Sequence, residues 1–105
     1  MASEQVSVIA RAKARPGMEE RLVEAIQEVV GPTRSEEGCI NYDLHRGVED
    51  PSEIVLYENW RSKADLDEHL SSSHVKGLLD KLPELSEDGV EITLFEMVSA
   101  PAPAL

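Results

Sequence analysis

Residues 39–60 read CINYDLHRGVEDPSEIVLYENW, and their pattern predicts two strands joined by a turn. Apolar residues recur at every second position over 39–46 and 53–60, which is the period of a β-strand. The residues between them, 47–52, contain glycine, aspartate and proline and are few enough for an antiparallel hairpin. The second strand alternates between two faces, with Ile54, Leu56, Glu58 and Trp60 on one and Val55, Tyr57 and Asn59 on the other.

One strand and one helix are predicted before this hairpin. Residues 6–14 alternate between two faces and begin with β-branched residues, so they predict a strand. We expect the helix that follows to stop at Gly31 and Pro32, because glycine adopts left-handed backbone and proline cannot continue a helix. The helix covers 18–30, where the apolar residues on one helical face are Met18, Leu22, Ala25, Ile26, Val29 and Val30.

A short helix is predicted directly after the hairpin. Ser62 and Asp65 form a capping-box pattern, with aspartate in place of the usual glutamate, and Leu66 and Leu70 follow at helical spacing. The serines at 71–73 interrupt this helix and offer a second N-cap.

The end of the chain predicts one more helix and one more strand. We expect the helix to end at Pro83. Residues 90–98 then alternate with a period of two and predict the last strand. The apolar stripe of the helix consists of Val75, Leu78, Leu79 and Leu82.

The order β-α-β-β-α-β, with the second helix divided in two, is the split βαβ pattern of ferredoxin-like α+β folds. Such a chain forms an antiparallel sheet with its helices on one face. Apolar residues on both faces of the strand 53–60 imply that the second face is also covered. A second copy of the same sheet is the simplest cover, so we expect a homodimer. Residues 1–99 are predicted to form this single domain, and 100–105 an extended Ala/Pro tail.

The composition narrows the classes of partner and the compartment. The 105 residues include 21 acidic and 10 basic ones, which gives a net charge of −11. A surface this acidic repels phosphate backbones and anionic lipids, so we expect neither nucleic-acid nor membrane partners. Cys39 is the only cysteine, which excludes an internal disulfide. Residues 1–5 lack the features of a secretory signal, so a cytoplasmic protein is expected.

Histidine is the residue type in this sequence best suited to acid–base chemistry. The signatures of nucleotide-binding loops, zinc motifs and serine hydrolases are absent. His69 lies three residues after Leu66 and His74 four residues before Leu78, so each borders the apolar face of its helix. Both rings can face the space between helices and sheet, where Trp60 would form a wall. Two interpretations stay open: a general base near neutral pH, or a helix cap and a structural hydrogen bond.

Glu58 lies among apolar residues, where a carboxylate must be paired or protonated because burying it alone is costly. It could orient a histidine or an arginine. A structural ion pair with Arg34 or Arg46 is an equally good interpretation of the sequence.

The remaining polar candidates are weaker. His45 is a less favoured candidate for chemistry than the two helix histidines, and Cys39 is interpreted as a small core residue. A metal site formed by His69, His74 and Glu58 is conceivable. The histidine pair spans a helix break without standard ligand spacing, so no metal is expected.

Several strings occur together in a familiar order: KARPG at 13–17, PTRSEEGCINYDLH at 32–45, LYENWRS at 56–62 and HLSSSH at 69–74. In this combination the chain resembles the antibiotic biosynthesis monooxygenase family, small dimeric α+β barrel proteins that include quinol monooxygenases. The resemblance covers nearly the whole predicted domain and implies the same fold and the same homodimer.

The resemblance implies oxidation of a small quinol or phenolic substrate by molecular oxygen, with no flavin, haem or metal cofactor. An electron-rich substrate that has lost a proton can pass an electron to oxygen, so the protein supplies a base, orientation and a dry pocket. On this interpretation His69 or His74 is the base. The residues expected to line the substrate site are Trp60, Tyr57, Asn41, Asn59 and Glu58.

Other activities occur on the same family pattern and stay open at this point. The His-x-x-x-x-His string at 69–74 is similar to that of an isomerase that acts on a phosphorylated quorum-sensing signal. Haem-degrading relatives use a tryptophan followed by a histidine, but few aromatic residues and an acidic surface argue against a dianionic macrocycle. A dimer that binds a metabolite without converting it is the non-enzymatic alternative.

Overall fold

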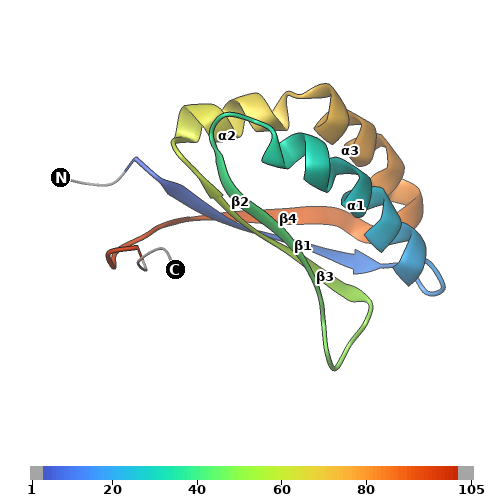
Figure 1. The fold of residues 1–105 in the computed structure, drawn as a ribbon. Coiled ribbons are helices and arrows are strands. Elements are labelled where there is room, and N and C mark those ends of the chain that lie inside the picture. The colour runs from blue at the N-terminus through green and yellow to red at the C-terminus, as the bar shows by residue number, and fades with distance from the viewer. Residues whose placement is uncertain (1–3, 102–105) are drawn as a thin grey trace.

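The computed structural model describes residues 4–101, and Figure 1 shows a four-stranded antiparallel sheet with three helices on one face. The strand order is β2-β3-β1-β4. This is the ferredoxin-like βαββαβ fold that the sequence predicted. The elements are β1 (Val6–Ala14), α1 (Glu19–Arg34), β2 (Cys39–Arg46), β3 (Glu53–Trp60), α2 (Lys63–Leu70), α3 (Ser73–Leu85) and β4 (Ser86–Glu96).

The register of the sheet follows from the alternating pattern of β1, which lies between β3 and β4. Val8 pairs with Glu58 on β3 and with Leu94 on β4, so all three side chains share the face that the helices cover. From residue 10 to the end of β1 this face carries only alanines, Ala10, Ala12 and Ala14, whose small side chains let the helices approach the sheet closely. The core lies between this face and the buried residues of the helices, Leu22, Ala25, Ile26, Val29, Val30, Leu66, Leu78, Leu82 and Leu85.

The helix α1 does not stop at Gly31 and Pro32, so that prediction was wrong. It continues to Arg34 with Pro32 inside it. A proline disfavours helical backbone in the residue before it through that residue's Cβ, and Gly31 has none. The extra turn is retained because it brings Arg34 to β2, where its guanidinium donates to the Tyr42 carbonyl and to Asp43.

The helix α3 likewise passes through its proline. The predicted end at Pro83 was wrong, since α3 ends at Leu85 and β4 begins at the next residue, Ser86. The Pro83 carbonyl accepts a hydrogen bond from Arg15, and the Ser86 hydroxyl donates to a carbonyl of the last turn. The last strand therefore starts before the predicted residue 90 and ends before 98.

The predicted caps of α2 and α3 are confirmed. The Ser62 hydroxyl accepts from the amide of Asp65 at the start of α2, and Ser72 does the same for Val75 at the start of α3. Ser72 also donates to the His69 carbonyl at 2.6 Å, so one hydroxyl connects the end of α2 to the start of α3.

The face of the sheet opposite the helices is bare in the described chain (Figure 1). It carries polar residues together with Tyr57 and Phe95, whose side chains are 41% and 48% exposed. Among residues 4–101 no helix has the length and apolar character needed to cross a membrane. Of the predicted tail, residues 102–105 lie outside the described residues.

Candidate active site

A small apolar cavity of about 80 Å³ lies between the sheet and the helices α2 and α3. Three side chains with an ionisable group line it: His69 from α2, Glu58 from β3 and Tyr42 from β2. The apolar lining comes from both layers of the fold and includes Ala10, Ala12, Ile26, Leu56, Leu70, Val75, Leu78, Leu79, Leu82, Val90 and Ile92.

His69 is almost fully enclosed, with 3% of its surface exposed. Its ring packs against that of Trp60, with centroids 4.5 Å apart, and meets the edge of Tyr42 at 5.4 Å. Its Nδ1 lies 2.7 Å from an Oε2 oxygen of Glu36. Aromatic packing and one strong hydrogen bond therefore fix the orientation of this imidazole.

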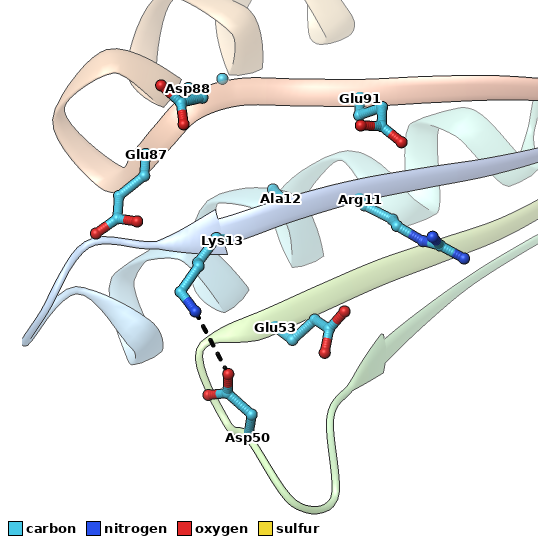
Figure 2. A pocket seen from close by; sticks show the side chains of 9 residues that line it. Arg11, Ala12, Lys13, Asp50, Glu53, Glu87, Asp88 and Glu91 are labelled. Atoms are coloured by element: carbon cyan, nitrogen blue, oxygen red, sulfur yellow. Dashed lines mark ion pairs between the residues drawn. The ribbon is translucent and has the colours of Figure 1, made fainter.

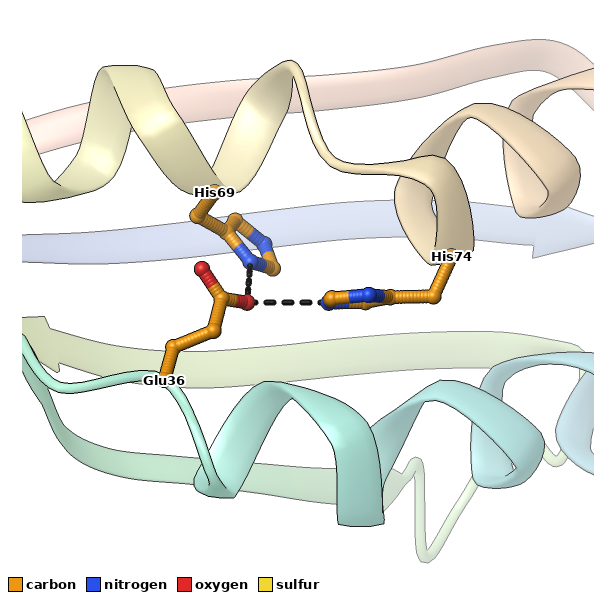
Figure 3. A group of neighbouring side chains, drawn as sticks. All are labelled: Glu36, His69 and His74. Atoms are coloured by element: carbon orange, nitrogen blue, oxygen red, sulfur yellow. Dashed lines mark hydrogen bonds and ion pairs between the residues drawn. The ribbon is translucent and has the colours of Figure 1, made fainter.

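Glu36 lies in the short connection between α1 and β2 and contacts both helix histidines, as Figure 3 shows. The Nε2 of His74, in the first turn of α3, lies 2.9 Å from the same Oε2 oxygen. A carboxylate only accepts hydrogen bonds, so both ring nitrogens donate to it. The opposite ring nitrogen of each histidine is then the one that carries a lone pair.

The electrostatics of the site suit a neutral His69. Burial lowers the pKa of His69 below its usual value, while the hydrogen bond to Glu36 and the charge of Glu36 oppose this effect in part. Glu36 thus holds a proton on Nδ1 and leaves Nε2 free to accept one. An imidazole held in this way beside an apolar cavity has the chemistry required of a general base.

The pKa of Glu58 is shifted in the opposite direction from that of His69. Burial raises its pKa to about 7, although a hydrogen bond from Trp60 Nε1 to Glu58 Oε1 at 2.8 Å opposes the shift. Within residues 4–101 it forms no ion pair, and Arg34 and Arg46 pair instead with Asp43 and Glu20. The proposed pairing of Glu58 with either arginine was therefore wrong. The cavity holds a carboxyl group that is partly protonated at neutral pH.

The structure does not bring all predicted site residues together. Tyr57, Asn41 and Asn59 lie on the bare face of the sheet, across β3 from Trp60 and Glu58. There the Asn59 amide donates to Asn41, and its carbonyl oxygen accepts from Ser7 and Gln5.

Two other candidates also lie outside the cavity. His45 is exposed on β2, where its Nδ1 meets the Asp43 carbonyl at 3.1 Å. Cys39 packs against the core, and burial, with the negative charges of Glu36 and Glu58, raises the pKa of its thiol to about 11. It therefore stays protonated and non-nucleophilic at neutral pH.

A larger hollow of about 350 Å³ lies at the far end of the bare face, and Figure 2 shows its charged lining. Lys13 pairs with Asp50 across it at 3.5 Å, and Glu53 and Glu91 lie near Arg11. It is open, charged and without a buried acid or base. The smaller cavity at His69 is therefore the better candidate for chemistry.

Sequence reasoning missed Glu36 and Tyr42 as members of the site. Glu36 stands in a loop, where no periodicity reveals its neighbours, and it meets His69 and His74 across 33 and 38 residues of chain. Tyr42 carries the signal of a buried strand position, which does not distinguish a core residue from a site wall. The group able to hold a metal is Glu36, His69 and His74, with Glu36 in place of the Glu58 considered above.

Fold and site together define a class: a small α+β protein with a buried, oriented histidine in an apolar cavity under its helices. The sequence pattern described as Antibiotic biosynthesis monooxygenase matches residues 5–81, and the chain belongs to this family.

Relatives and solved structures of the family agree with this assignment. The Mycobacterium tuberculosis protein named "Putative monooxygenase Rv0793" is 38% identical over 90 residues, 86% of this chain and 88% of that protein. Its solved structure has a TM-score of 0.87 and 34% identity, covering 93% of this chain and 99% of that one. The Escherichia coli K12 protein named "Probable quinol monooxygenase YgiN" is 35% identical over 81 residues, 68% of this chain and 78% of that protein.

Proposed function

We propose that this protein is a monooxygenase that oxidises a small quinol or phenol with molecular oxygen, using no flavin, haem or metal in the reaction. The observation that carries the proposal is the buried His69, which Glu36 orients and which lines an apolar cavity together with Glu58. The names of the relatives support the reaction class. The chemistry of the cavity supports a substrate that supplies its own electrons.

The first step on this proposal is proton removal. His69 Nε2 takes the proton of a substrate hydroxyl, and Glu36 stabilises the imidazolium that forms. The resulting phenolate is electron-rich and passes an electron to oxygen. Substrate and reduced oxygen then combine, which forms a carbon–oxygen bond at a ring carbon that bears hydrogen, ortho or para to the hydroxyl.

Glu58 carries out the remaining two proton transfers of the proposed reaction. Its carboxyl proton goes to the new peroxide, and the carboxylate then removes the hydrogen from the same ring carbon. The oxygen–oxygen bond breaks, a carbonyl forms, and the departing hydroxide takes the proton held by His69. One phenol and one oxygen molecule thus give one quinone and one water, and both protein groups return to their starting states.

The cavity limits the size of the substrate. Its volume of about 80 Å³ is about half that of a 150 Å³ engineered cavity that binds benzene. A ring would therefore fill the cavity and extend into its open side, where the partly exposed Leu70, Leu79 and Ile92 offer apolar contacts. This favours a flat aromatic substrate of one or two rings over a macrocycle such as haem.

The predicted homodimer is part of the proposal. The bare face of the sheet combines half-exposed Tyr57 and Phe95 with the buried amide network around Asn59. Packing this face against a second copy would bury the aromatic side chains, which gives the association its driving force. On this arrangement Tyr57, Asn41 and Asn59 serve the dimer interface, and the cavity of each subunit lies on the outer side.

Oxygen uptake by the purified protein tests the activity. We expect protein-dependent uptake with at least one member of a panel of hydroquinones, naphthohydroquinols and phenols, after subtraction of autoxidation in buffer. The product should carry one new oxygen atom, as a quinone from a phenol or a hydroxyquinone from a hydroquinone, with one oxygen molecule consumed per substrate and no hydrogen peroxide released. Uptake no greater than autoxidation across the panel, with ligand binding still detectable by calorimetry, would contradict the proposal and indicate an isomerase or a binding protein.

A further inference from the structure

We propose that Glu36, His69 and His74 also form a binding site for one divalent transition-metal ion, with Zn²⁺ as the preferred occupant. The site shares His69 and Glu36 with the proposed reaction, and that reaction itself uses no metal. Three ligand atoms converge there: His69 Nδ1, His74 Nε2 and Glu36 Oε2 lie within 4.8 Å of one another. Both ring nitrogens point at the same carboxylate oxygen and therefore at the same small volume (Figure 3).

The distances are close to those of a coordinated ion. In a tetrahedral zinc site with bonds of about 2.0 to 2.2 Å, neighbouring ligand atoms lie about 3.3 Å apart. The nitrogen–oxygen distances here are 2.7 and 2.9 Å. The three ligand atoms span up to 4.8 Å, so for an ion to enter the carboxylate must withdraw by about half an ångström and the two ring nitrogens must move closer together. Glu36 lies in a loop and His74 in the first turn of α3, both with partly exposed side chains, so these are the two ligands best able to adjust.

The charge of the surroundings favours a cation. Glu36 and Glu58 lie close enough for the charge of one to raise the pKa of the other. Across the part of the chain that the structure describes, neither carboxylate has an ion pair with a lysine or arginine. A divalent ion would supply the missing positive charge.

The ligand types favour a particular class of ion. Two imidazole nitrogens and one carboxylate suit Zn²⁺, Co²⁺, Ni²⁺ and Cu²⁺ and do not suit Mg²⁺ or Ca²⁺, which prefer oxygen ligands. His69 closes the inner side of the site, and the partly exposed His74 and Glu36 leave an approach from solvent for the ion and for a water as fourth ligand.

Calorimetric titration of the metal-stripped full chain with Zn²⁺ tests the site. We expect one ion per chain, and at least tenfold weaker binding after His74→Ala or Glu36→Gln. His45→Ala is the matched control, because His45 is exposed on a different strand, and it should bind as the wild type does. Equal affinity in the wild type and the two site variants, or an equal loss in the control, would overturn the proposal.

Loading the unmodified protein with Co²⁺ gives a readout that does not depend on any variant folding. Two histidines bound to the ion should give two sets of paramagnetically shifted imidazole proton resonances. A Co²⁺-loaded protein with no shifted imidazole signal would equally overturn the proposal. Neither measurement requires turnover, so the metal site and the proposed oxygenase activity can fail independently.

Discussion

At the scale of single residues, the site depends on two buried groups with shifted pKa values, His69 and Glu58, and on Glu36, which orients His69. Glu36 accepts the hydrogen bond from His69, burial lowers the pKa of His69 and so favours its neutral form, and burial keeps Glu58 partly protonated at neutral pH. A base with a lowered pKa and an acid with a raised pKa in one cavity are the conditions under which both are in their reactive forms near neutral pH. The identity of each residue therefore matters more than its volume.

Replacing His69 by asparagine tests its role as the base. The amide keeps a donor on this side chain but cannot accept the substrate proton at neutral pH, so we expect kcat/KM for oxygen uptake to fall by about 10² to 10⁴-fold. The control is His45→Asn, a change on an exposed strand position. A His69→Asn variant as active as the control would contradict the assignment.

Replacing Glu58 by glutamine tests its raised pKa through stability. The folded protein holds this proton up to about pH 7, whereas an unfolded glutamate releases it near its model value of 4.5. The native state thus binds more protons between these values, and the free energy of unfolding falls as pH rises through that range. The fall contributed by Glu58 is about 3 kcal/mol at most.

Glu58→Gln should remove this part of the pH dependence while keeping an oxygen that accepts from Trp60 Nε1. Urea unfolding of wild type and variant from pH 4.5 to pH 8 measures the difference. Parallel stability curves for the two proteins would show that Glu58 titrates normally in the folded state. In the activity assay, the variant should also lose turnover at neutral pH, because it has no proton to give the peroxide.

At the scale of secondary-structure elements, the break between α2 and α3 positions both histidines. His69 lies in the last turn of α2 and His74 in the first turn of α3, and the Ser72 hydroxyl connects these two turns. The serine-rich segment therefore does more than separate two helices. It sets the distance at which the two rings meet Glu36.

Removing the Ser72 hydroxyl should loosen this junction. We expect Ser72→Ala to lower the free energy of unfolding by about 1 kcal/mol, because the first turn of α3 loses its cap. Ser71→Ala is the comparison, since that exposed hydroxyl contacts only a carbonyl of its own helix. Urea denaturation followed by circular dichroism measures both, and equal effects would show that the cap is unimportant.

The sequence predicted the elements well wherever periodicity and local chemistry agreed. The strand and helix order, the cap at Ser62, a second cap among the serines at 71–73 and the faces of β3 all follow from short-range pattern. It failed at Pro32 and Pro83, where tertiary contacts offset the local cost of proline in a helix. Those contacts depend on residues far along the chain, which no local rule includes.

The candidate site was predictable only in part, for a related reason. Helical spacing placed His69 beside the core, and strand alternation placed Glu58 and Trp60 on the covered face. Strand alternation also places Tyr57 and Trp60 on opposite faces of β3. The two side chains therefore cannot line the same substrate site, as had been predicted. Glu36 had no local signal, because its role comes from two hydrogen bonds to distant helices.

At the scale of the whole molecule, one face of the sheet is covered by helices and the other is bare. A lone sheet with half-exposed aromatic residues on its bare face is a marginal arrangement in water. In the proposed homodimer, a second copy of the chain covers these aromatic residues, so no other protein is needed.

Charge placed on the bare face should therefore prevent dimerisation. We expect Phe95→Asp to shift the protein from dimer to monomer in sedimentation velocity, because a carboxylate would be buried unpaired at the interface. Val48→Asp is the control, since this residue in the hairpin turn is 99% exposed. A wild-type protein that sediments as a monomer, or a Phe95→Asp dimer as stable as the control, would contradict the proposed interface.

Glu36 also has a consequence for how the chain folds. Its two partners are 33 and 38 residues away, and we expect them to reach it only after the hairpin of β2 and β3 has formed and both helices have docked on the sheet. Contacts between distant residues form late, because the loops between them must close first. Chain diluted from urea should therefore regain its helical circular dichroism before it regains turnover, and the delay measures the time needed for the helices to dock around Glu36.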